Sequence, residues 1–225
     1  MPRHYDLGRR AEQQAATRAR ILTAALELYR DRGFAATTTG AVAAAADVAP
    51  GTVRNHFPTL HDLAQAAGEQ VLSDLAPPDP SILHGLATVG ERVEHLIQEL
   101  VAFFERAEPW WSLLQRDPQL ARAWAGLAER YEREFDRLLR AALGPLADDP
   151  VAMVVTATTV GPPLHYALRG AGLSATEAIR AQLGVIVPWL EALGTERAGS
   201  SPAGPVRPGT AQRGAQLAGA SGAMA

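Results

Sequence analysis

Cysteine and lysine are both absent from this sequence of 225 residues. Without cysteine there is no disulfide, no zinc–thiolate site and no thiol nucleophile, a composition typical of a cytoplasmic protein. Without lysine, Schiff-base catalysis and the Walker A phosphate loop are excluded, because each requires a lysine side chain. All 21 basic residues are therefore arginine.

Long hydrophobic runs are also missing, and aromatic residues make up only 6% of the chain. No apolar run reaches the ~18 residues that a transmembrane helix requires. The first ten residues contain arginine but no apolar segment follows them, so they do not form a signal peptide. We therefore expect a cytoplasmic protein with no membrane partner.

The charge is unevenly distributed along the chain. Residues 1–56 carry eight arginines and five acidic residues, a difference of +3, whereas the whole chain carries −3 and the remainder therefore −6. A basic N-terminal segment on an acidic body favours a polyanionic partner for that segment alone.

The pattern of apolar residues predicts an all-α protein. The 44 alanines favour helix, and we find no hairpin signal and no internal repeat. We expect about nine helices, three short ones near the N-terminus and six in a larger body. Their expected ranges are 17–32, 38–46, 50–56, 60–75, 81–106, 109–115, 118–143, 149–169 and 175–193.

Local signals mark the ends of the first helices. Gly33 suits the left-handed position that ends a helix, Thr38 suits an N-cap, and Pro50 suits a first helical turn. Asp47 lies between the second and third helices, where a left-handed residue is needed, and aspartate tolerates that conformation better than most residues.

Residues 38–57 have the pattern of a helix-turn-helix. Two short helices that cross steeply need small residues at their contact, and Ala43 and Ala46 are placed there. The apolar residues that anchor the pair to the first helix are Val42, Val48, Val53 and Phe57. The second helix then presents polar groups suited to base edges or phosphate oxygens, namely Thr52, Arg54, Asn55 and His56.

This array resembles the TetR family of bacterial transcriptional regulators. The similarity covers residues 17–63 and includes Ile-Leu-x-x-Ala-Leu, Gly-Phe, Thr-Thr, Val-Ala, Val-x-Pro-Gly-Thr-Val, His-Phe-Pro and Asp-Leu. The resemblance implies a homodimer that binds a palindromic DNA operator, most simply a repressor, with a C-terminal domain that dimerises and binds a small-molecule inducer. The domains that we expect are a flexible arm at 1–16, a DNA-binding domain at 17–63, a ligand-binding and dimerisation domain at 64–194, and a disordered tail at 195–225.

The resemblance also implies roles for individual residues. Thr38, Thr52 and His56 match positions that contact the DNA backbone, and Pro50 and Gly51 form the turn into the recognition helix. The family usually has glycine where Asp47 stands and tyrosine where Arg54 stands. The complete set of expected DNA-binding residues is Thr38, Thr39, Pro50, Gly51, Thr52, Arg54, Asn55 and His56.

The role of the arginines in this region is open. Arg54 either donates two hydrogen bonds to guanine, worth about 1–3 kcal/mol of discrimination, or holds a phosphate. Arg3, Arg9 and Arg10 either reach neighbouring phosphates or the minor groove, or belong to a solvated arm.

The body holds most of the aromatic residues, which either line an apolar ligand pocket or form ordinary core. Gly161-Pro162-Pro163 interrupts a helix beside two of them and either shapes that pocket or joins two helices. The expected ligand-binding residues are Phe103, Phe104, Trp110, Trp111, Trp124, Tyr131, His165 and Tyr166, for an apolar or aromatic effector. The last two apolar segments resemble the family's dimer interface, with Val185, Ile186, Trp189 and Leu193 as expected contacts.

Two other classes of protein remain as alternatives. A metal-dependent helical enzyme would need paired Glu-x-x-His motifs, whereas Glu91, Glu94 and His95 occur once and with different spacing. A helical interaction adaptor would leave the polar recognition helix without a role. We therefore expect no catalytic residue, no metal and no cofactor.

Overall fold

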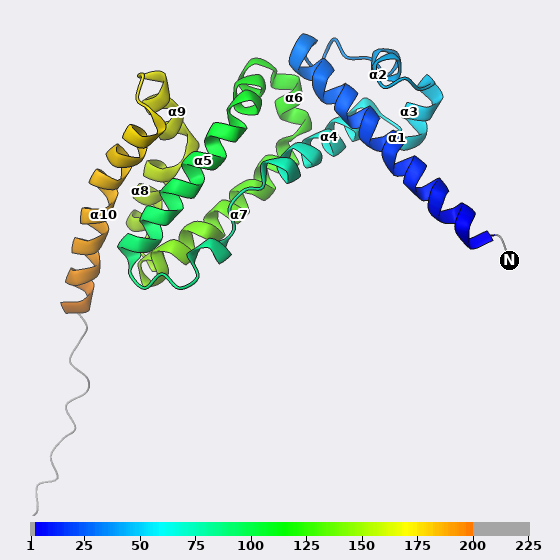
Figure 1. The fold of residues 1–225 in the computed structure, drawn as a ribbon. Coiled ribbons are helices and arrows are strands. Elements are labelled where there is room, and N and C mark those ends of the chain that lie inside the picture. Colours follow the sequence, from blue (N-terminus) through cyan, green and yellow to red (C-terminus); the bar gives the residue numbers. More distant parts are fainter. Residues whose placement is uncertain (1–2, 200–225) are drawn as a thin grey trace, which may run out of the picture.

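The computed structural model describes residues 3–199, which contain ten α-helices and two short 3₁₀ helices and no strand (Figure 1). The predicted all-α class is confirmed. The helices are α1 (Arg3–Arg32), α2 (Thr39–Ala45), α3 (Pro50–His56), α4 (Leu60–Leu75), α5 (Val89–Arg116), α6 (Pro118–Ala123), α7 (Ala125–Leu143), α8 (Pro150–Val160), α9 (Pro162–Gly170) and α10 (Ala175–Gly199), with 3₁₀ turns η1 (Pro80–Leu83) and η2 (Gly144–Asp148).

The molecule has two parts that are joined by α4 (Figure 1). Helices α1 to α3 lie at one end, and α5 and α7 to α10 form an elongated bundle at the other. Two hydrophobic clusters correspond to these parts. The first spans α1 to α4 but also contains Trp110, Leu113, Leu120 and Trp124 from α5 and α6 and the turn that follows, so the two parts share one continuous core where they meet.

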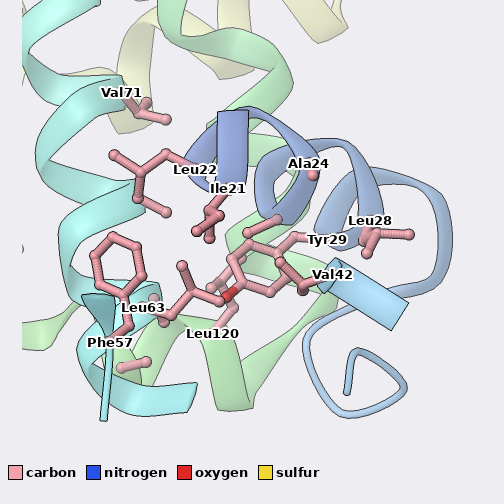
Figure 2. Packing of buried hydrophobic residues seen from close by; sticks show 14 of the residues in the cluster. Ile21, Leu22, Ala24, Leu28, Tyr29, Val42, Phe57, Leu63, Val71 and Leu120 are labelled. Atoms are coloured by element: carbon pink, nitrogen blue, oxygen red, sulfur yellow. The ribbon is translucent and has the colours of Figure 1, made fainter. Parts of the chain in front are cut away.

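The first cluster is built around α1. Ile21 and Tyr29 are fully buried, and Val42, Phe57 and Leu63 pack around them from α2, the end of α3 and α4 (Figure 2). The apolar positions of α1 repeat every three or four residues, which places them on one face of the helix. The N-terminal half of α1 extends beyond this cluster. Residues 8–16 are exposed, and Thr17 is partly buried.

Several expected boundaries are wrong. The first helix begins at Arg3 rather than at residue 17, because a run rich in alanine, glutamine and arginine continues the helix nucleated by the buried residues after it. At the other end, α10 continues through 195–199, where we expected a tail. Residues 200–225 of the expected tail lie outside the described residues.

The long helix of the body also begins and ends later than its apolar pattern indicates. A capping box between Thr88 and Glu91 starts α5 at Val89. The helix then continues through Pro109 to Arg116, so the separate segment expected at 109–115 is its last part. The helix expected at 118–143 is instead divided at Trp124, and the one expected at 149–169 is divided at Gly161, where Gly-Pro-Pro predicted a break.

Candidate functional site

Helices α2 and α3 form the helix-turn-helix that the sequence predicts. Thr38 caps α2, its hydroxyl oxygen accepting a hydrogen bond from the Ala41 amide at 3.2 Å. Asp47 has φ +52°, the left-handed conformation expected at the turn, and Pro50 opens α3. Ala43 and Ala46 are buried at the contact, as their small size allows.

The outer surface of α3 is polar and accessible. Arg54 and Asn55 are exposed, and Thr52 and His56 are half-buried. Within residues 3–199, no hydrogen bond or ion pair holds Arg54. Thr38, at the start of α2, is also exposed, and its hydroxyl still has a hydrogen to donate because the cap uses only the oxygen. Pro50 is exposed and Thr39 and Gly51 are half-buried, so the expected DNA-binding residues share one accessible end of the molecule.

Helix α1 passes close to the end of the recognition helix. The Arg18 guanidinium lies 5.2 Å from the centre of the Phe57 ring, directly after α3. A cation over an aromatic ring is attracted to its π-face. This contact joins α1 to the residue that directly follows α3.

The body contains an apolar cavity of about 340 Å³. Seven of the eight expected ligand-binding residues lie in its wall. They are Phe103, Phe104, Trp110, Trp111, Trp124, Tyr131 and Tyr166. Helix α4 adds Gly68, Val71, Leu72 and Leu75, and the wall is completed by Leu114, Gln115, Ala121, Leu127, Ala128 and Pro162. None of these described wall residues carries a charge.

The polar atoms of the wall differ in whether they have a hydrogen-bond partner. The Trp124 indole N–H donates to the Ala64 carbonyl at 2.8 Å, and the Tyr166 hydroxyl donates to the Phe104 carbonyl at 3.0 Å. The Tyr131 hydroxyl is buried with no hydrogen-bond partner among the described residues. Burial raises the pKa of both tyrosines, Tyr131 and Tyr166, so each hydroxyl keeps its proton.

His165, the eighth expected residue, is not in the cavity wall. It is fully buried behind Tyr166, with its Nε2 atom 3.2 Å from the Glu105 carboxylate. Burial lowers the pKa of His165, and Glu105 partly opposes that shift. Arg169 also binds Glu105, at 2.8 Å, so this polar group joins α9 to α5.

Two hydrogen bonds attach the two ends of α6 to segments that pack in the helix-turn-helix core. Asp117 accepts from the Phe34 amide at 2.6 Å, while its other oxygen caps α6 by accepting from the Gln119 and Leu120 amides. Trp124 provides the second bond, to Ala64 of α4. Helix α6 is therefore attached at one end to the segment after α1 and at the other end to α4.

The contact of α4 with α7 depends on a glycine. A Cβ atom on Gly68 would lie 2.5 Å from Leu127 Cδ1 and 2.8 Å from the Trp124 ring. This close approach leaves no room for a larger residue at position 68.

The sequence did not predict that α4 lines the cavity or that Asp117 joins the two parts. A glycine inside an otherwise regular helical pattern was the signal available for the close approach of α4.

An exposed apolar face lies on α8 and α10. Val151 is 59% exposed, Val154 65% and Val185 68%. Of the expected dimer contacts, Val185 is on this face, and Trp189 and Leu193 are half-buried. Ile186 is fully buried within the chain, so its assignment to a dimer interface is wrong: the helix turns its side chain inward, next to Val185.

Residues 3–199 contain neither a candidate metal site nor a candidate membrane span. No three His, Asp or Glu side chains gather as a metal site. No helix in this range has the length and apolar content to cross a membrane.

Comparison with known proteins identifies the N-terminal part. Residues 21–67 match the model of the bacterial regulatory proteins of the tetR family. Residues 21–67 therefore form a helix-turn-helix domain of the tetR type. The match begins at Ile21 and ends within α4, so it contains the helix-turn-helix described above. No curated protein matches the chain.

The fold of this chain also occurs in solved structures. A putative fatty acid metabolism regulator from Clostridium perfringens has a TM-score of 0.55 at 13% identity, covering 75% of this chain and 97% of its own. A putative TetR-family transcriptional regulator from Mesorhizobium loti has 0.51 at 20% identity, covering 80% and 97%. The superantigen PfiT has 0.51 at 21%, covering 74% and 94%. At these identities the likeness concerns the fold alone.

Proposed function

We propose that this protein is a ligand-responsive transcriptional repressor in the cytoplasm, which binds a palindromic operator as a dimer and leaves it when a small molecule enters the cavity. The observation that carries the proposal is the double role of α4. Its first half packs Leu63, Ala64 and Ala67 into the helix-turn-helix core, and its second half lines the cavity with Gly68, Val71, Leu72 and Leu75.

The DNA contact is proposed for α3 and the start of α2. Thr52, Arg54, Asn55 and His56 would face the major groove, with Thr38 and Thr39 on the phosphates. A dimer places two recognition helices in successive major grooves about 34–36 Å apart. The sequence of the operator follows from which bases Arg54 and Asn55 contact.

The dimer interface is proposed for the exposed face of α8 and α10. Large exposed apolar side chains on two helices that contact each other are costly in water and favour an interface. Val151, Val154 and Val185 would form its centre, with Trp189 and Leu193 at its edge. A twofold axis there would bring the same face of a second copy against it.

The release step is proposed to act through α4 and α6. A molecule in the cavity touches Val71 and Leu75 of α4 and Ala121 of α6, and these helices hold the helix-turn-helix through the bonds of Trp124 and Asp117. A ligand shifts the equilibrium between a DNA-binding and a released arrangement of these helices by the difference in its affinity for the two. No enzymatic activity is part of this proposal.

Selection of DNA from a random pool by the purified full-length protein tests this function. We expect a palindromic site whose half-sites lie one helical turn apart, bound with strong dependence on salt. The matched control is the R54A/N55A variant, which keeps every buried residue of α3. Failure of the wild-type protein to enrich any sequence over this variant would overturn the proposed function.

A further inference from the structure

We propose that the cavity is specific for an uncharged aromatic molecule that carries one hydrogen-bond acceptor, and that the Tyr131 hydroxyl donates to this acceptor. The inference deepens the proposed function and rests on the cavity being its effector site. Four features of the wall carry it: its lack of charge, the Arg30 guanidinium that lies on the Trp110 ring, two stacked pairs of aromatic rings, and one donor without a partner.

The lack of charge in the wall disfavours ionic ligands. No Arg, His, Asp or Glu is among the described residues that line the cavity. An ion that leaves water for such a site loses its hydration and gains no opposite charge in return. A phosphate-bearing or carboxylate ligand would find no guanidinium here, although arginine is abundant elsewhere in the chain.

A cationic ligand could still be attracted by the aromatic rings, but the Trp110 ring already has a cation on it. The Arg30 guanidinium of α1 lies 3.8 Å from the centre of the Trp110 ring. Trp110 lines the cavity and also lines a neighbouring groove that contains Arg30, so the indole stands between the two spaces. A cationic ligand stacked on the cavity side would face Arg30 through the ring, and like charges repel.

The shape of the wall favours a flat ligand. Phe103 and Tyr131 are stacked with their rings inclined at 22°, and Trp111 and Tyr166 are stacked at the same angle. Nearly parallel pairs present flat surfaces, and aromatic rings pack on such surfaces in offset-stacked or edge-on geometry. A planar aromatic molecule fits this wall better than a long flexible chain.

The acceptor is assigned from the hydrogen-bond partners of the wall. The hydroxyl of Tyr131 is the one polar atom of the described wall residues that is buried without a partner, since Tyr166 and Trp124 donate to backbone carbonyls. A buried donor without a partner is costly, and a ligand carbonyl that accepts from it removes the cost. The Tyr131 hydroxyl keeps its proton because burial raises its pKa.

Four naphthalene derivatives of similar size test the proposal by calorimetric titration of the full chain in the absence of DNA. They are 2-acetylnaphthalene, which has an acceptor; 2-isopropylnaphthalene, which lacks one; 2-naphthoate, an anion; and 2-naphthylmethylammonium, a cation. We expect the ketone to bind most tightly and both ions to bind at least about tenfold more weakly. Equal binding of either ion, or no binding of the ketone, overturns the proposal.

Two variants test the individual residues. In Y131F, the ketone should lose about tenfold in affinity, while 2-isopropylnaphthalene binds unchanged or better. Y166F is the matched control, because the Tyr166 hydroxyl already donates to the Phe104 carbonyl. This variant should change the affinity for the two probes by the same factor. R30Q should improve binding of the cation several-fold relative to the ketone. An unchanged ketone affinity in a folded Y131F protein refutes the role of Tyr131.

These measurements are separable from the proposed function. They use no DNA, so a protein that binds the ketone but selects no operator would contradict the proposed function alone. A protein that selects an operator but binds the ions as tightly as the ketone would contradict this inference alone.

Discussion

Replacement of Asp117 by alanine tests whether the helix-turn-helix and the body are joined as the structure describes. The Asp117 carboxylate accepts three backbone hydrogen bonds, one from Phe34 and two from the first turn of α6. Loss of an N-cap costs about 0.5–2 kcal/mol, and loss of a hydrogen bond to a charged group about 1.5–3 kcal/mol. Because one partly buried group makes both interactions, we expect D117A to lose about 2–4 kcal/mol of unfolding free energy.

The assay is urea unfolding followed by tryptophan fluorescence, which reports on the junction because Trp110 and Trp124 are buried there. D149A is the matched control. Asp149 caps α8 through the Val151 and Ala152 amides and pairs with Arg197 of α10 at the surface, where an ion pair contributes little to stability, but it makes no bond to the helix-turn-helix. We expect D117A to be clearly less stable than D149A. Equal losses in the two variants would refute the idea that Asp117 joins the two parts.

Three further predictions concern the interface, the buried histidine and α4. V185D places a carboxylate on the exposed apolar face and should convert a dimer to a monomer in sedimentation velocity, whereas Q98D, on exposed α5 surface, should not. Burial lowers the pKa of His165 below its ordinary 6.5, so the unfolded chain binds a proton that the folded chain resists. Stability should fall as the pH drops below 6.5, and urea midpoints of H165Q should show a weaker fall. G68A should be destabilised by about 1–3 kcal/mol in urea, since its Cβ would overlap Leu127 and Trp124; unchanged stability would contradict the close contact of α4.

The sequence predicted those parts of the fold that local chemistry decides. The Thr38 cap, the left-handed Asp47 and Pro50 in the first turn of α3 each depend on a few neighbouring residues, and each is found as expected. The aromatic residues of the cavity were also predicted, because large apolar side chains on long helices gather between them.

The remaining features depend on contacts between distant segments. The division at Trp124 accompanies its hydrogen bond to Ala64, 60 positions away, and the role of Asp117 depends on Phe34, 83 positions away. Ile186 and Val185 are adjacent apolar residues on a helix that is apolar on several sides, so periodicity does not tell which one faces outward. Only packing against the rest of the bundle distinguishes them.

The most direct test of the central claim is the affinity of the full-length protein for its selected operator with the cavity empty and with it filled. Fluorescence anisotropy of labelled operator DNA would be measured with and without saturating 2-acetylnaphthalene. The account predicts that the ketone weakens operator binding by about tenfold or more, within the usual range of coupling between two sites. By linkage, saturating operator must weaken ketone binding by the same factor. An operator affinity that stays the same when the ketone is bound would contradict the account.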